Sequence, residues 1–334
     1  MEKPVPDPRQ PFVALIVGVT CMAGLSLAEA LKSPKALAGP WKVYGSAFRP
    51  MPTWFPSSVL DKYIAFDATD AGDTADKLPP FSGKVTHVFW VAIQDRESEH
   101  VNVTVNATTL SNVLHVLNGG RCSRQPHHGS DRHPTLHGSR EVVRTPSIII
   151  GASSRSRYST LLTLAVAANM GCRNRRRQEP SFGNRYAWEH FCDISDARVL
   201  AEQQIWAAVT DGAKNQAFNC TNGDFFTWKS VWKKLCDIFH LEFITFEESK
   251  NFDFVEFMTE KSRVWDEIVE KNGLYNTKLE EITCPMALKT VLHFMFQHVC
   301  SMNKSREFGF FGYAHTLKSI PLWVERLRHM KIIP

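Results

Sequence analysis

The stretch that most constrains the fold lies near the start of the chain, in residues 13–31. An apolar run is followed there by a glycine-bearing turn and then by an amphipathic run. This succession predicts a strand, a phosphate-binding loop and a helix, as in dinucleotide-binding folds. Gly18 permits the tight turn, and Gly24 lets the helix pack closely on the sheet with its N-terminal amides facing a pyrophosphate. Cys21 stands where such loops usually have a second glycine. Its Cβ takes up space in which the backbone and a phosphate would otherwise approach each other closely.

The same run would also suit a membrane span or a signal peptide. It has about 20 mostly apolar residues, with Lys3 and Arg9 ahead of it. Pro11 in front, Glu29 inside the helical part and the lack of a later span favour a buried strand and helix. We therefore expect a soluble, cytoplasmic protein.

The length and the cysteines agree with that expectation. A chain of 334 residues can bury one large α/β domain with a smaller appendage. Its eight cysteines form no CxxC pair. Scattered cysteines of this kind indicate reduced thiols rather than disulfides or a zinc site.

Positive charge is concentrated in the middle of the chain. Residues 121–185 hold twelve arginines and three acidic residues, so this stretch carries +9 while the remainder carries −4. Arg173, Arg175, Arg176 and Arg177 would suit a nucleic acid, but no aromatic residues are interleaved with them, which favours a solvated loop. Four histidines within 118–145 invite a metal hypothesis, but glycine and proline interrupt any helical spacing, so we predict no metal site. These are His127, His128, His133 and His137.

A second strand is predicted at 41–47, and its tip bears on cofactor choice. In dinucleotide folds a carboxylate at this tip accepts the ribose 2′-hydroxyl of NAD, whereas an arginine suits the 2′-phosphate of NADP. The tip reads Phe48-Arg49-Pro50 and has no acid. The expected cofactor is therefore NADPH.

Strands and helices then alternate. We expect strands at 63–66 and 85–92 and a helix at 97–117, which together predict a Rossmann-type, doubly wound parallel sheet. Residues 118–145 show no period of either kind and are predicted to be disordered. A strand at 146–150 and a helix at 158–170 follow, then an amphipathic helix capped by Asp193 or Ser195. Further helical segments are expected at 227–239, 253–272, 286–302 and 317–330.

Three later blocks are distinctive: Asn222–Lys229, Asp196–Ala208 and Ser301–Phe310. With the first strand and loop, they resemble the plant progesterone 5β-reductase and iridoid synthase family. Members of that family are atypical short-chain dehydrogenases/reductases, which use NADPH to reduce the activated C=C bond of enones. The resemblance covers residues 12–117 and 146–334.

The resemblance implies a division of the chain into four parts. Residues 12–117 would form the N-terminal half of an NADP-binding Rossmann domain, and 146–215 its remainder. Residues 216–334 would form a helix-rich substrate or lid region. Between the two halves, 118–145 would be an aberrant Arg/His-rich segment, so that the central part of the sheet is incomplete.

The resemblance also implies cofactor contacts. Besides Gly18 and Gly24 of the loop, they fall on Thr20, Cys21, Met22, Phe48, Arg49, Asp67, Ala68, Ala92, Ile93, Ile149, Ser156, Arg157 and Tyr158. Two of these positions depart from the family, because Cys21 replaces its loop glycine and Phe48 replaces the first of its paired arginines. Loss of that arginine weakens the 2′-phosphate site.

A larger departure concerns the catalytic residues. The family needs a tyrosine and a lysine near the enone oxygen, where they stabilise the enolate. This chain has no tyrosine between Tyr63 and Tyr158 and no lysine between Lys84 and Lys214. Residues 118–145, where the pair belongs, are too few for its strand and helix, and they resemble out-of-frame or mis-spliced coding sequence. Tyr158 or Tyr186 could substitute as proton donor; otherwise the catalytic residues are unknown.

Two functions stay open at this point. The first is an NADPH-dependent reductase of an enone or steroid-like small molecule, impaired by the loss of its catalytic pair. The second is an inactive, truncated paralogue that at most binds nucleotide or a partner. Neither involves a nucleic acid or a membrane, and a homodimer is left open.

Overall fold

The computed structural model describes residues 11–119, 141–172, 183–246 and 253–334. Within it the chain forms two compact units. Unit 1 comprises residues 1–20, 27–143 and 204–216, and unit 2 comprises residues 21–26, 144–203 and 217–334. The four histidines of the metal hypothesis and the arginine run at 173–177 lie outside the described residues, as does most of the segment predicted to be disordered. The four-part division stays a prediction.

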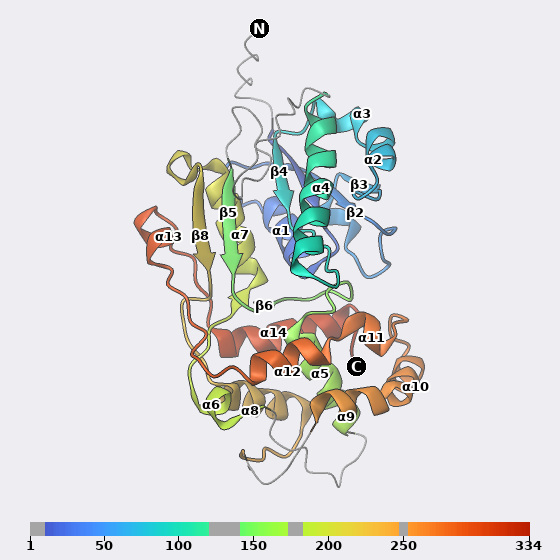
Figure 1. The fold of residues 1–334 in the computed structure, drawn as a ribbon, viewed down its shortest axis with the longest axis vertical. Coiled ribbons are helices and arrows are strands. Elements are labelled where there is room, and N and C mark those ends of the chain that lie inside the picture. Colours follow the sequence, from blue (N-terminus) through green and yellow to red (C-terminus); the bar gives the residue numbers. More distant parts are fainter. Residues whose placement is uncertain (1–10, 120–140, 173–182, 247–252) are drawn as a thin grey trace. The chain divides into compact units, whose positions relative to one another are not determined.

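Unit 1 contains a four-stranded parallel sheet with strand order β3-β2-β1-β4. Its strands are β1 (Val13–Val17), β2 (Lys42–Ala47), β3 (Lys62–Ala65) and β4 (His87–Trp90). All five residues of β1 are apolar and buried, as expected of a central parallel strand covered on both faces. Figure 1 shows the arrows of this sheet together with the helices that connect them.

The connections within unit 1 are mostly helical. They comprise α1 (Met22–Lys32), whose first residues belong to unit 2, and η1 (Ser57–Val59), α2 (Ala71–Lys77), α3 (Pro79–Ser82), α4 (Glu99–Leu117) and η2 (Asp211–Ala213). Asp70 caps α2 by accepting two backbone N–H groups, and Ser98 caps α4. A shared apolar core packs Leu15, Ile64, Phe66, Leu78 and Val113 together. The predicted alternation of strands and helices is confirmed here.

Two further strand pairs complete the described sheets. β5 (Val142–Pro146) pairs with β8 (Gln216–Cys220), and β6 (Ile149–Ile150) pairs in parallel with β7 (Ser195–Asp196). In the part of the chain that the structure describes, no strand lies between β4 and β5; residues 120–140 lie outside it, so the expected gap in the sheet stays a prediction. Residues 142–145, at the end of the segment predicted to be disordered, lie in β5.

Unit 2 is rich in helices. They are α5 (Thr160–Cys172), α6 (Arg185–Glu189), the first half of α7 (Ala197–Val209), α8 (Trp228–Phe239), α9 (Phe254–Glu260), α10 (Ser262–Asn272), α11 (Leu279–Ile282), α12 (Pro285–Leu292), α13 (Asn303–Glu307) and α14 (Thr316–His329). Figure 1 shows α5 in contact with both α12 and α14. None of the described helices combines the length and apolar character needed to cross a bilayer.

Two local predictions are wrong. The helix expected over 286–302 ends at Leu292, because the following segment runs beside Cys192, with which His298 forms a parallel β-bridge. The cap of α7 is neither Asp193 nor Ser195. Asp196 accepts the Arg198 N–H at 2.9 Å, while the Ser195 hydroxyl donates to the Cys220 carbonyl and Asp193 accepts the N–H of Cys300.

Candidate active site

Gly18 ends β1 in a conformation that suits only glycine. Its φ is +94°, and a Cβ there would lie 2.8 Å from the backbone nitrogen of Ala92. The N–H groups of Gly18 and Val19 both donate to the Ser46 carbonyl, at 2.8 and 3.0 Å. In unit 1 this glycine therefore allows the ends of β1, β2 and β4 to come close together.

Two N–H groups in the first turn of α1 already have hydrogen-bond acceptors within the protein. Cys21 Sγ accepts the Gly24 N–H at 3.3 Å, and the Ser156 hydroxyl oxygen accepts the Met22 N–H at 3.1 Å. Burial raises the pKa of the Cys21 thiol, so it stays protonated at neutral pH and acts as a weak, neutral acceptor. The Cys21 thiol thus accepts the Gly24 N–H, which could otherwise donate a hydrogen bond to a phosphate.

Phe48 and Arg49 follow β2 at the surface of unit 1. The Phe48 side chain is 65% exposed, and Arg49 is also exposed. The Tyr63 hydroxyl donates to the Arg49 carbonyl at 2.6 Å, which fixes the backbone of the tip. Within the described ranges, no ion pair involves the Arg49 guanidinium. It can therefore accept an anion without first releasing an internal partner.

The other predicted contacts of unit 1 lie at the ends of β3 and β4. Asp67 Oδ1 accepts both the N–H and the hydroxyl of Thr69, at 2.9 and 2.7 Å, so this carboxylate stabilises the turn formed by residues 67–69. The Ala68 carbonyl accepts from Asn112 Nδ2 at 3.1 Å. Thr20 is buried and Ala92 is half-buried, whereas Ile93 is 79% exposed beyond β4.

The predicted contacts of unit 2 follow β6. Ile149 is half-buried and lies opposite Ser195 in the β6–β7 pair. Gly151 is close-packed, because a Cβ there would lie 2.8 Å from the Met22 Cβ and 3.0 Å from the Ala197 Cβ. Arg157 lies over the exposed ring of Tyr158, at 5.1 Å from its centroid. No contact that the structure describes joins Tyr158 to Tyr186, whose ring stacks on His190 at 3.8 Å.

Two of the distinctive sequence blocks meet in a buried polar network of unit 2, which we call the Asp196 network. Arg198 donates two hydrogen bonds to the buried Asp196 carboxylate, at 3.0 and 2.6 Å. The Asp196 N–H donates to Asn222 Oδ1, and Asn222 Nδ2 donates to the Thr316 hydroxyl. Thr316 in turn donates to Asp224. Hydrogen bonds from Arg198 and Ser319 outweigh burial and lower the pKa of Asp196.

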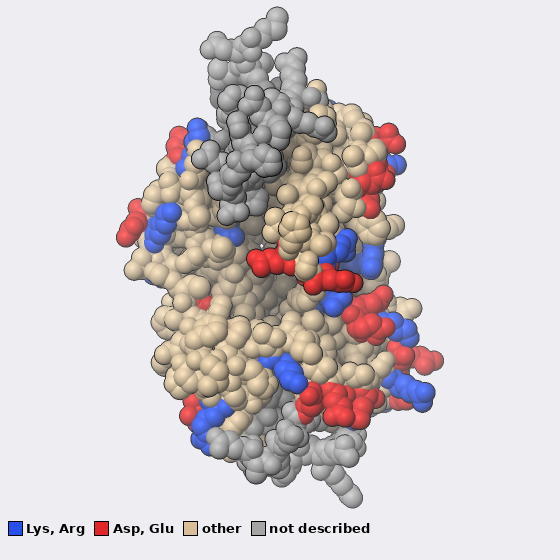
Figure 2. All heavy atoms as spheres, in the orientation of Figure 1, with Lys and Arg blue, Asp and Glu red and all other residues tan. Residues whose placement is uncertain are grey.

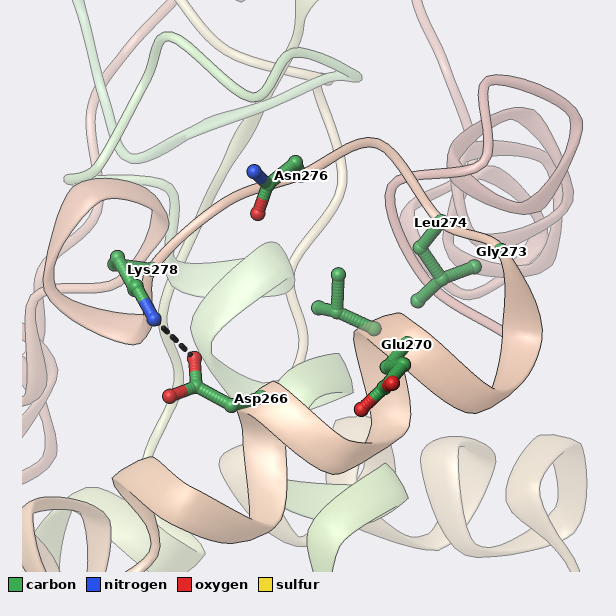
Figure 3. A pocket seen from close by; sticks show the side chains of 7 residues that line it. Asp266, Glu270, Gly273, Leu274, Asn276 and Lys278 are labelled. Carbon is green, nitrogen blue, oxygen red and sulfur yellow. Dashed lines mark hydrogen bonds and ion pairs between the residues drawn. The ribbon is translucent and has the colours of Figure 1, made fainter.

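A surface hollow lies apart from these residues. It has a volume near 310 Å³ and is lined by α10 and the chain that follows it. Figure 3 shows Asp266 and Lys278 paired at its edge, with nitrogen and oxygen 3.0 Å apart. On the face drawn in Figure 2, small groups of basic and acidic side chains alternate, and the described residues form no continuous basic surface there. Neither feature brings predicted site residues together.

Known proteins resemble this chain over nearly its whole length. It is 38% identical to the 3-oxo-Δ(4,5)-steroid 5β-reductase of Arabidopsis thaliana, across 98% of this chain and 95% of that protein. It is 36% identical to the (S)-8-oxocitronellyl enol synthase CYC2 of Camptotheca acuminata, across 96% and 93%. The enol synthase of Catharanthus roseus is 34% identical, across 96% and 92%. This chain belongs to the plant steroid 5β-reductase and 8-oxocitronellyl enol synthase family. The resemblance inferred from the three blocks is confirmed.

Solved structures agree with this family's fold. WbmG of Bordetella bronchiseptica, in complex with NAD and UDP, superposes with a TM-score of 0.59 at 15% identity, covering 97% of each chain. UDP-glucose 4-epimerase of Thermotoga maritima has a TM-score of 0.59 at 11% identity, covering 95% of this chain and 99% of that one. At such identities the likeness shows the fold alone, an extended short-chain dehydrogenase/reductase of Rossmann type. No general family model matches the chain.

The alignment with the Arabidopsis steroid 5β-reductase also shows a deletion. It runs over 373 positions, more than the 334 residues of this chain, so the relative has residues that this chain lacks. The individual site residues stay predictions.

Proposed function

We propose that this chain is an NADPH-dependent reductase of the C=C bond of enones, slowed by the loss of the family's tyrosine and lysine. Its membership of a reductase family, at 38% identity over 98% of the chain, carries the proposal. The substrate would be a 3-oxo-Δ4-steroid or a small α,β-unsaturated carbonyl compound. The mainly reduced cysteines suit the cytosol, since the described ones form no disulfide.

The described residues fit a dinucleotide phosphate at two places. Arg49 is exposed at the tip of β2, where an arginine can bind the 2′-phosphate of NADPH. Gly18 leaves the end of β1 without a side chain. Cys21 departs from this fit, because its thiol already accepts the Gly24 N–H, so we expect weaker binding of the pyrophosphate. When bound, NADPH supplies the hydride for the reduction.

The protein's own part in the chemistry is to hold the enone and stabilise charge on its oxygen. Reduction at the β-carbon turns the carbonyl oxygen into an enolate, which needs a hydrogen-bond donor. Removing one such donor typically costs about 10² to 10³ in rate. With both family donors absent from the sequence, we propose a slow enzyme.

An inactive paralogue is the second candidate. The internal caps on the Met22 and Gly24 amides favour it, since both groups would have to be released for a phosphate to bind. In that case the chain would bind nucleotide weakly, and no enone would be reduced.

Substitution of Arg49 tests the cofactor choice. We expect Arg49→Gln to raise the Kd for NADPH by about one to two orders of magnitude, because a charge-assisted hydrogen bond is worth roughly 1.5–3 kcal/mol. The Kd for NADH should not change. Arg263→Gln, at another exposed arginine, is the matched control. Fluorescence titration with each nucleotide measures both constants, and an equal loss for NADH and NADPH would contradict the 2′-phosphate assignment.

A further inference from the structure

A buried carboxylate faces a half-exposed imidazole in unit 2. The Asp193 side chain is fully buried; its Oδ2 accepts the Cys300 N–H, and its Oδ1 has no hydrogen-bond partner among the described residues. Oδ1 lies 3.7 Å from His298 Nδ1. The Ser147 hydroxyl oxygen lies 3.3 Å from the same nitrogen. Two hydrogen-bond acceptors, Asp193 Oδ1 and the Ser147 hydroxyl oxygen, thus lie near Nδ1 of the imidazole.

The hydrogen bonds decide which ring nitrogen carries the proton in neutral His298. The Ser147 hydroxyl donates its single proton to the Asp193 carbonyl, at 3.2 Å. Its contact with His298 must therefore be one in which Nδ1–H donates. The Asp193 carboxylate can only accept, which favours the same tautomer. Nε2 is then the atom that gains and loses a proton.

Nε2 is free to act on another molecule. The His298 side chain is 31% exposed, and no hydrogen bond of Nε2 is found in the described part of the chain. The ring stacks on Phe294, with centroids 5.6 Å apart, and the exposed Phe296 lies 6.3 Å away. This apolar surrounding suits a hydrophobic carbonyl compound.

One carboxylate lies close to the imidazole. Asp193 Oδ1 lies 3.7 Å from the ring, Cys192 forms a backbone β-bridge with His298, and Cys300 is two residues further along the chain. Burial raises the pKa of the Cys192 thiol to about 12, and it also raises the pKa of Cys300. Both thiols are neutral at physiological pH, so the Asp193 carboxylate is the charge that stabilises an imidazolium there.

Backbone hydrogen bonds tie this group to the strand after which the cofactor contacts of unit 2 are predicted. The Asp193 N–H donates to the His298 carbonyl at 2.9 Å, and the Ser195 N–H donates to the Ile148 carbonyl at 2.8 Å. Ser147 precedes Ile149 by two residues, and the family resemblance puts the nicotinamide beside Ile149. The imidazole is thus attached to the segment where reduction would occur.

We infer that His298 donates the proton that completes enone reduction, with Asp193 and Ser147 as positioning residues. This inference rests on the proposed function. A hydride with its electron pair adds to the β-carbon, the C=C electron pair moves to the carbonyl oxygen, and the resulting enolate takes the Nε2 proton of the imidazolium. The neutral imidazole regains a proton from water. His298 thereby fills the role that the missing tyrosine has in the family.

The first test compares His298→Gln with His293→Gln, a matched change at an exposed histidine of the same segment. With NADPH and a 3-oxo-Δ4-steroid, we expect His298→Gln to lower kcat about 10²-fold, the usual effect of losing a general acid. Because the acid must be protonated, kcat of the native protein should fall as pH rises, and the variant should lack this alkaline limb. Nucleotide binding, followed by thermal shift, should be unchanged. His293→Gln should retain the native kcat and pH profile. His298→Asn serves if the glutamine variant does not fold.

A second test needs no turnover. In ¹⁵N-histidine-labelled protein, the ring spectrum of neutral His298 should show the proton on Nδ1, and Ser147→Ala should reduce that preference. An Nε2–H tautomer, or a His298→Gln variant within threefold of the native kcat, overturns the role of His298 and leaves the reductase standing. A native protein that forms no product overturns both.

Discussion

The four-stranded sheet of unit 1 and the Asp196 network of unit 2 are stabilised in different ways. In the sheet, β1 buries five apolar residues and its contacts are between hydrocarbon groups. In the network, the fully buried Asp196 carboxylate accepts hydrogen bonds from Arg198, and the Asp196 N–H donates to Asn222, which in turn donates to Thr316. Burial of apolar area is non-directional, whereas a buried charge needs partners at fixed positions. The sheet should therefore tolerate changes of shape poorly, and the network should tolerate changes of charge poorly.

The largest effect is expected from Asp196→Asn. It removes the charge of the fully buried Asp196 carboxylate, and hydrogen bonds to a charged group are worth roughly 1.5–3 kcal/mol each. Because the Arg198 side chain is 47% exposed and water can compensate it, we expect the free energy of unfolding to fall by about 2 to 3 kcal/mol. Asp266→Asn removes an ion pair in which both partners are about half exposed, so the free energy of unfolding should fall far less than in Asp196→Asn. Urea denaturation measures both. Equal losses of unfolding free energy in the two variants would show that the Asp196–Arg198 pair stabilises the fold no more than an exposed ion pair does.

Gly18→Ala should have the next largest effect. The new Cβ would lie 2.8 Å from the Ala92 nitrogen at a positive φ, and such strain costs about 2 kcal/mol. Gly83→Ala is the control, since a Cβ there meets nothing within 4 Å and the φ is −78°. Thermal unfolding of the two variants distinguishes them. A stable Gly18→Ala protein would mean that the end of β1 can move away from β4.

A smaller effect concerns pH. The pKa of Asp196 is lower in the folded than in the unfolded protein, so its stabilisation is complete above the unfolded pKa of about 3.9 and is lost as pH falls through the folded value. The difference in unfolding free energy between native protein and Asp196→Asn should therefore be constant from about pH 5 to 7 and shrink below about pH 4. Urea midpoints across this range measure it. A difference that grew toward low pH would contradict the assignment.

The sequence predicted the sheet better than it predicted the site. The strands of unit 1 follow from apolar runs that the sequence shows directly. The Asp196 network could be recognised only as family-like blocks, because its partners are separated by up to about 120 positions and carry no spacing signal. The group of Ser147, Asp193 and His298 gave no signal at all for the same reason.

Two errors have the same physical origin. The helix expected to continue through 302 ends at Leu292, since bridging to Cys192 holds the next segment extended. Asp196 caps α7 in place of Ser195 or Asp193, because both of these residues hydrogen-bond to other segments. In each case a partner far away in the sequence overrides the local preference, and a short sequence window does not include that partner.

Transfer of a labelled hydride tests the central claim most directly. Purified protein is incubated with NADPH deuterated at the transferred position of the nicotinamide and with a 3-oxo-Δ4-steroid, and the product is analysed by mass spectrometry. We predict a saturated ketone that carries one deuterium at the former β-carbon, formed slowly but well above a protein-free blank. Recovery of unlabelled, unreduced steroid after prolonged incubation would contradict the reductase and leave the inactive paralogue.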